Sequence, residues 1–179
     1  HSWEIYPQRY AYDFVMVDDE VKTYAKDPQV VSNYYCYGQD VIAPADGVVV
    51  QVGHTCEDSR IMPNAQTDPL IKDIRGNFVV IKHYEGEYSL LAHLQPKSIS
   101  VKVGDAVVRG MKIAQCGNTG NTSEPHLHFQ VQTTTSFYIS EGIKIRFKGI
   151  ERRMQPNYEV IDPREVVKDD NFYEENEYI

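Results

Sequence analysis

Short stretches of alternating apolar and polar residues recur along this chain at intervals of roughly ten residues, and they constrain its fold more than any other feature. Clusters of Gly, Pro, Asn and Asp separate these stretches, and few segments have the period of a helix. Thirteen tyrosines and six phenylalanines, together with many Val and Ile residues, favour strands. The sequence therefore predicts an all-β fold, antiparallel and built from hairpins, with little helix.

Residues 8–17 alternate well enough to predict a first strand. Further on, short turn-forming segments separate three pairs of stretches, a pattern typical of β-hairpins: residues 41–43 with 48–52, 78–83 with 88–94, and 106–108 with 111–114. Two longer segments, 18–40 and 53–75, have no sustained period and are predicted to be loops. Loops of this length are where we expect substrate specificity to be determined.

The 179 residues are enough for one domain with its own core. We expect this domain to span residues 1–150, with a core of about 8–131. Residues 151–179 are charged, punctuated by Pro and end in a run of acidic residues. They are predicted to be an acidic extension that packs on the domain or trails from it.

The net charge of −8, without any cluster of Lys and Arg, argues against a nucleic-acid partner. No apolar run approaches the roughly 18 residues of a membrane span, so none is expected. No signal peptide is recognisable, and because the chain begins at His1 rather than Met, we expect an N-terminal segment to have been removed.

Three cysteines, Cys36, Cys56 and Cys116, form an odd set without a CxxC spacing, which excludes a recognisable thiolate metal site. The sequence leaves two alternatives open: one disulfide with a third, free thiol, or three unpaired thiols.

The run from Glu124 to Val131, EPHLHFQV, follows a turn-rich segment and predicts a strand. His126 and His128 would share one face of it, about 6.5–7 Å apart along the strand, while the residues between and after them face the core. Two imidazoles on a rigid element are well placed to form part of a metal site. Asp13 interrupts the apolar side of the first strand. It is either a buried carboxylate with hydrogen-bond partners in the protein or a ligand.

In order along the chain, Asp13 and five motifs resemble the lysostaphin-type, or LytM-like, metallopeptidases: APADGVVV (43–50), GNFVVIKH (76–83), SLLAHL (89–94), VKVGDAVVRGMKIAQCGNTG (101–120) and EPHLHFQV (124–131). The resemblance implies a single β-rich domain with a lysostaphin-type, barrel-like sheet. It also implies a bound Zn²⁺ and cleavage of peptide bonds in bacterial peptidoglycan. The family's habit of working outside the cytoplasm implies a secreted or cell-envelope protein.

Carried over by position, the resemblance makes Asp13 and His128 metal ligands, and His93 and His126 catalytic. A catalytic zinc keeps three protein ligands and leaves a fourth position for water. Two imidazoles beside it can orient or deprotonate that water and stabilise the oxyanion.

Arg9 departs from the family pattern, because it lies four residues before Asp13, where a metal-binding His is expected. A guanidinium has no lone pair for a metal. In one hypothesis His1 supplies the missing imidazole and the chain is a zinc endopeptidase. In the alternative, Arg9 pairs with Asp13 and the degenerate domain binds proteins or the cell wall. A sugar-binding β domain with tyrosine stacking platforms is a third class, which the composition permits but no spacing demands.

Overall fold

The computed structural model describes residues 6–146. The chain divides into two units after Lys144, and the first of them carries every strand described below. The predicted acidic extension and His1 lie outside the described residues, so the predicted domain boundary stays a prediction.

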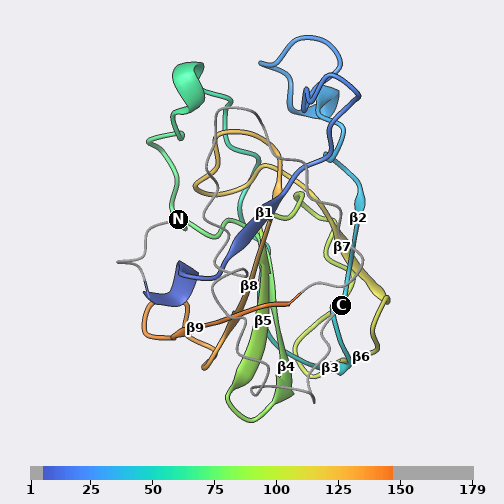
Figure 1. The fold of residues 1–179 in the computed structure, drawn as a ribbon, viewed down its shortest axis with the longest axis vertical. Helices are drawn as coiled ribbons and strands as arrows, with labels where there is room; N and C mark the ends of the chain where they lie inside the picture. The colour runs from blue at the N-terminus through green and yellow to red at the C-terminus, as the bar shows by residue number, and fades with distance from the viewer. Residues whose placement is uncertain (1–5, 147–179) are drawn as a thin grey trace. The chain divides into compact units, whose positions relative to one another are not determined.

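A seven-stranded antiparallel sheet forms the body of the first unit (Figure 1). Its strand order is β1-β8-β5-β4-β3-β6, and β9 also pairs with β8. The strands are β1 (Tyr12–Phe14), β3 (Gly47–Gly53), β4 (Phe78–Tyr84), β5 (Glu87–Ala92), β6 (Ala106–Val107), β8 (Leu127–Gln132) and β9 (Gly142–Ile143). Helix within residues 6–146 is limited to three short 3-10 turns, η1 (Tyr6–Gln8), η2 (Val31–Asn33) and η3 (Pro63–Ala65). The prediction of an all-β, antiparallel fold is confirmed.

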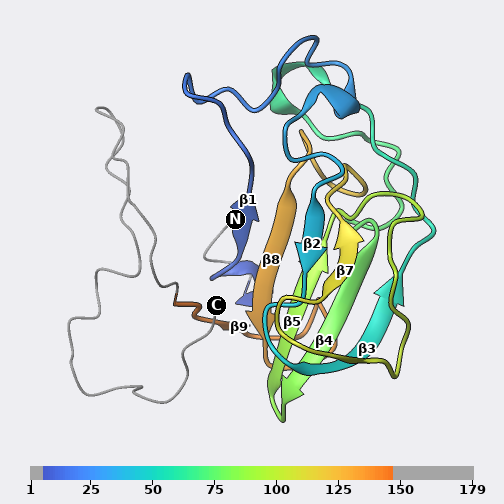
Figure 2. The same cartoon turned by 90° about the vertical axis from the view of Figure 1, so that its right-hand side faces the viewer.

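A second, two-stranded sheet of β2 (Asp40–Ile42) and β7 (Lys112–Gln115) forms another layer over one face of the large sheet (Figure 2). Both layers contribute completely buried aliphatic side chains, among them Val49, Ile81 and Ile113. Burying each such side chain stabilises the fold by roughly 1.5–3 kcal/mol.

One of the three predicted hairpins forms and two do not. β4 and β5 pair directly around the turn after Tyr84, as predicted. The pairing predicted within 41–52 is wrong, because β2 pairs with β7 in the second sheet while β3 pairs with β4 and β6. β6 belongs to the large sheet and β7 to the second sheet. The hairpin predicted within 106–114 is therefore wrong as well. The predicted first strand is also shorter than residues 8–17, since only Tyr12–Phe14 pair with β8.

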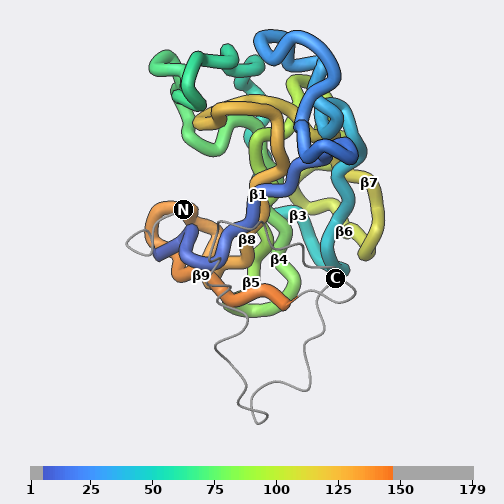
Figure 3. Tube along the Cα trace, turned by 45° about the horizontal axis from the view of Figure 1, so that its top comes forward, coloured from blue at the N-terminus to red at the C-terminus, as the bar shows by residue number. Residues whose placement is uncertain are grey.

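The predicted loops 18–40 and 53–75 stay largely irregular, and both lie beyond the N-terminal end of β8 (Figure 3). Hydrogen bonds anchor them to the turn before β8: Thr23 Oγ1 donates to Glu124 Oε2 at 2.8 Å, and Asn118 Nδ2 donates to the Ser59 carbonyl at 2.8 Å. The loop 53–75 also contributes residues to the site described next.

The three cysteines are free thiols, and Cys36 Sγ donates to the Pro125 carbonyl at 2.9 Å. In the described part of the chain, no helix has the length and apolar character needed to cross a membrane.

Candidate active site

The register of β8 with its neighbours brings distant parts of the chain together. β8 lies between β1 and β5, and its His128 pairs with Asp13 on one side and Ala92 on the other. Directly opposed residues of antiparallel strands point to the same face. His93 follows Ala92 at the end of β5, and His126 directly precedes β8.

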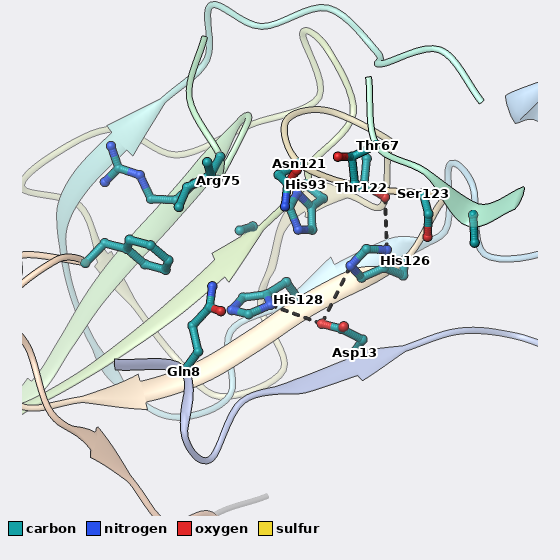
Figure 4. Close-up of a pocket in the computed structure, with 14 residues that line it drawn as sticks. Gln8, Asp13, Thr67, Arg75, His93, Asn121, Thr122, Ser123, His126 and His128 are labelled. Atoms are coloured by element: carbon teal, nitrogen blue, oxygen red, sulfur yellow. Dashed lines mark hydrogen bonds and ion pairs between the residues drawn. The ribbon is translucent and has the colours of Figure 1, made fainter. Parts of the chain in front are cut away.

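Four predicted site residues converge on one cavity of about 400 Å³ (Figure 4). Asp13 Oδ1 lies 3.0 Å from His128 Nδ1 and 3.6 Å from His126 Nε2. The ring of His93 has its centre 4.6 Å from that of His126 and 5.7 Å from that of His128. The structure therefore brings Asp13, His93, His126 and His128 together, while their chemical roles stay predictions. The fifth predicted residue, His1, lies outside the described residues.

Hydrogen bonds to backbone groups hold His93 in place. Its N–H donates to the Arg75 carbonyl at 3.0 Å, and its own carbonyl accepts from the Gly117 N–H at 3.0 Å. These bonds hold its backbone at a φ of 62°, a left-handed conformation that costs a non-glycine residue on the order of 1 kcal/mol. Strain of this kind is common at functional sites.

The His93 ring also has a defined tautomer. Nδ1 lies 2.7 Å from the Thr119 carbonyl, which can only accept, so Nδ1 carries the proton and Nε2 carries the lone pair. Burial and the positive charges that His126 and His128 can carry lower the pKa of His93 to about 3. His93 is therefore neutral at neutral pH.

His126 has the same tautomer for the same reason. Its Nδ1 donates to the Glu124 carbonyl at 2.8 Å and lies 3.1 Å from Thr122 Oγ1. Its Nε2, with the lone pair, points towards Asp13. Burial lowers the pKa of His126, and the Asp13 carboxylate opposes that shift.

The donor set of Asp13 and His128 fits a divalent cation. Two ligands of a tetrahedral zinc ion lie roughly 3.4 Å apart, close to the 3.0 Å between Asp13 Oδ1 and His128 Nδ1. Within residues 6–146, no group of three or more His, Cys, Asp and Glu side chains could hold a metal ion.

Arg9 does not line the cavity. The central carbon of its guanidinium lies 4.7 Å from the centre of the Tyr6 ring, at the distance of a cation–π contact. Asp13 Oδ1 instead lies beside the rings of His126 and His128.

Sequence reasoning missed several polar residues at the site. Gln8 and Thr122 line the cavity, and Gln130 accepts a hydrogen bond from the His128 ring. The signal for Gln130 was present, because it follows His126 and His128 at the same two-residue spacing along β8. Nothing in the sequence pointed to Gln8 or Thr122.

The model of peptidase family M23 matches residues 31–139. The chain is 34% identical over 93 residues to an uncharacterized metalloprotease of Haemophilus influenzae, a match that covers 52% of this chain and 16% of that protein. It is 36% identical over 94 residues to the peptidoglycan DD-endopeptidase ShyA of Vibrio cholerae, covering 52% of this chain and 17% of ShyA. The match thus spans about a sixth of each relative.

Two solved structures are also similar. The catalytic domain of lysostaphin from Staphylococcus simulans is 24% identical, with a TM-score of 0.43, over 68% of this chain and 85% of that one. A zinc-containing peptidase from Vibrio cholerae is 28% identical, with a TM-score of 0.41, over 65% of this chain and 35% of that one. The match of the family model, at residues 31–139, takes in more than half of the 179 residues, and the chain therefore belongs to peptidase family M23.

Proposed function

We propose that this peptidase is a zinc-dependent endopeptidase that cleaves peptide bonds in bacterial peptidoglycan. The observation that carries the proposal is the convergence of Asp13, His93, His126 and His128 on one cavity, in an arrangement that suits both a metal ion and a base. Asp13 and His128 would hold the zinc ion, and His1 is the proposed third ligand. A bound zinc ion supplies a Lewis acid that activates water and polarises the scissile carbonyl.

His126 is the better candidate for the general base. Its Nε2 lone pair is available because Nδ1 donates to a backbone carbonyl, and the nearby Asp13 carboxylate stabilises the imidazolium that forms when Nε2 takes a proton. The same nitrogen can then return the proton to the leaving amine. His93 stays neutral, so its Nε2 would orient the attacking water by accepting a hydrogen bond.

The substrate and the location are inferred from the relatives. ShyA is a peptidoglycan DD-endopeptidase, and we extend a peptidoglycan peptide substrate to this chain. That substrate requires an extracytoplasmic location, secreted or at the cell envelope. The cavity, which residues of the loop 53–75 help to line, would receive the peptide.

A degenerate domain that binds proteins or the cell wall is the second candidate. Arg9 at the position of the expected His favours it, because Asp13 and His128 alone would bind zinc weakly. Zinc stoichiometry of the purified protein separates the two candidates. We expect one zinc ion per chain in the parent and a large loss of affinity in His1→Ala. Unchanged tight binding in His1→Ala would remove His1 from the site.

The catalytic assignment is tested with His126→Ala. We expect this variant to keep its zinc and to lose peptide release from purified peptidoglycan by at least about 100-fold, because it lacks the base. Released peptides are measured by mass spectrometry. His54→Ala is the control, since His54 is exposed and does not line the cavity. Cleavage by His126→Ala at the parental rate would contradict the assignment.

A further inference from the structure

A row of three buried polar side chains runs along one face of β8 below the cavity. His128, Gln130 and Gln132 are 3%, 1% and 0% exposed. In the register of β8 with β5 they stand opposite Ala92, Leu90 and Tyr88, which form an apolar row. Buried amides next to apolar side chains must find hydrogen-bond partners within the protein.

The three side chains bond to one another in sequence, and a backbone carbonyl ends the chain. Gln132 Nε2 donates to the Thr134 carbonyl at 2.7 Å. Gln130 Nε2 donates to Gln132 Oε1 at 2.6 Å, and Gln130 Oε1 lies 2.9 Å from His128 Nε2. We call Gln130 and Gln132 the glutamine relay.

The carbonyl of Thr134 sets the direction of every bond in the relay. A carbonyl only accepts, so the NH₂ group of Gln132 must face it, and the Gln132 oxygen must face Gln130. The Gln130 oxygen then faces His128 Nε2, which has to donate. Reversing either amide would place two donors or two acceptors against each other in a buried place, which is unfavourable.

This direction decides where the lone pair of His128 lies. With the proton on Nε2, the neutral ring has its lone pair on Nδ1, 3.0 Å from Asp13 Oδ1. The opposite tautomer would donate Nδ1–H to Asp13 instead, so the relay and the carboxylate compete for the single proton. To bind a metal ion, His128 needs its lone pair on the side of the cavity, which is Nδ1. The relay favours the tautomer that has it there, with the proton on Nε2.

We propose that Gln130 and Gln132 are positioning residues that hold neutral His128 in the Nε2–H tautomer and thereby present its Nδ1 lone pair, beside Asp13, to a metal ion. The inference rests on the proposed function, in which His128 is a metal ligand. It goes beyond that function by assigning a role to two residues that do not touch the metal position.

The tautomer is measured directly in the metal-free protein. Histidine labelled with ¹⁵N is observed by NMR at about pH 8.5, about two units above the ordinary pKa of histidine in peptides. We expect His128 of the parent to carry its proton on Nε2. In Gln130→Met, which keeps side-chain length but removes the acceptor, the proton should move to Nδ1 and towards Asp13. Gln130→Glu loses the bond to Gln132 but keeps an acceptor opposite His128 Nε2, so it should retain the parental tautomer.

Zinc affinity, measured by competition with a chelator, gives the second readout. Gln130→Met should bind zinc about 10–100-fold more weakly than the parent, as for other residues that orient metal ligands. Gln130→Glu should stay within a few-fold of the parent. Gln115→Met is the matched control, because Gln115 is a partly buried strand residue whose amide donates to the Gly38 carbonyl and which does not line the cavity. If Gln130→Met does not fold, Gln132→Met removes the anchor of the relay and should shift the tautomer in the same direction.

The outcomes separate the two proposals. A parental His128 with its proton on Nδ1, or a Gln130→Met variant with parental tautomer and zinc affinity, overturns the positioning role. A parent that binds no zinc although His128 has the expected tautomer overturns the proposed function instead.

Discussion

The three histidines around the cavity differ in which ring nitrogen carries the proton, because their hydrogen-bond partners differ. His93 and His126 donate from Nδ1 to the carbonyls of Thr119 and Glu124, whereas His128 donates from Nε2 to the glutamine relay. The first two therefore present Nε2 lone pairs, which suits proton transfer, and His128 presents Nδ1, which suits metal binding. In the sequence His126-Leu127-His128, nothing except their order distinguishes the two histidines, so this difference between the rings could not be predicted.

Stability should depend on pH through the same rings. The pKa of His93 is lowered to about 3 and that of His126 is lowered too, mainly by burial. An unfolded histidine titrates near pH 6.5, so below that value the unfolded chain binds more protons than the folded one. The free energy of unfolding of the metal-free protein should therefore fall as the pH is lowered from about 6.5 towards 3.

Urea unfolding at about pH 7.5 and pH 5 measures this dependence. Carboxylates also contribute on the acid side, so the comparison with variants is decisive. His93→Gln should lose less stability than the parent over this interval, because it lacks the buried titrating group. His54→Gln, with an exposed side chain replaced, should behave as the parent does. An equal loss in His93→Gln and the parent would mean that His93 is not the group concerned.

At the scale of elements, two turns pack against each other directly behind His93. Gly76, before β4, and Gly120, before β8, both have a positive φ, at 65° and 83°. A Cβ atom on Gly76 would lie 2.3 Å from the carbonyl carbon and oxygen of Thr119. The carbonyl that orients the His93 ring is thus held in place by a contact that only glycine permits.

Replacing Gly76 by Ala should therefore damage both stability and activity. The positive φ costs about 1 kcal/mol and the clash adds about 1–3 kcal/mol, so we expect a loss of about 2–4 kcal/mol in chemical denaturation. Gly86→Ala is the matched control, because Gly86 has a φ of 75° but nothing within 4 Å of the added Cβ. Peptide release should fall in Gly76→Ala only. Equal effects of the two substitutions would show that the contact with Thr119 is unimportant.

The sequence predicted local pairings better than distant ones. The β4–β5 hairpin and the strand after His126 were correct, because alternation and a short turn are both local signals. The partners of β2, β3, β6 and β7 were missed, because each pairs with a strand far along the chain. Nothing local distinguishes such strands from two halves of a hairpin.

The candidate site shows the same limit. Motif order led to Asp13, His93, His126 and His128, and the structure brings these four together. The groups that orient them include the Thr119 and Thr134 carbonyls, which are backbone atoms and have no residue-type signature. Gln130 could have been found from the two-residue period of β8, but its role depends on the direction of the relay, which no pattern reveals.

For the molecule as a whole, the proposed metal would add a second link between two strands that pair over only three residues. Asp13 belongs to β1, a three-residue strand at the edge of the large sheet, and His128 belongs to β8, the next strand of that sheet. Phe14 is 40% exposed and Asp13 has 41% of its side chain exposed, so β1 buries little surface of its own. A ligand that binds only the folded chain stabilises it by about 4 kcal/mol at 1,000 times its dissociation constant.

Removing zinc should therefore lower the melting temperature by about 8–16 °C, at roughly 2–4 °C for each kcal/mol in a chain of this size. Because the ion would bridge β1 and β8, chelation should also speed hydrogen exchange of the Tyr12–Phe14 amides more than that of the β4 and β5 amides. Both effects should reverse when zinc is restored, and both should be absent in His128→Ala, which lacks one ligand. A parent whose melting temperature responds to neither chelation nor added zinc would instead favour the metal-independent binding module, because Asp13 and His128 would then hold β1 to the sheet without an ion.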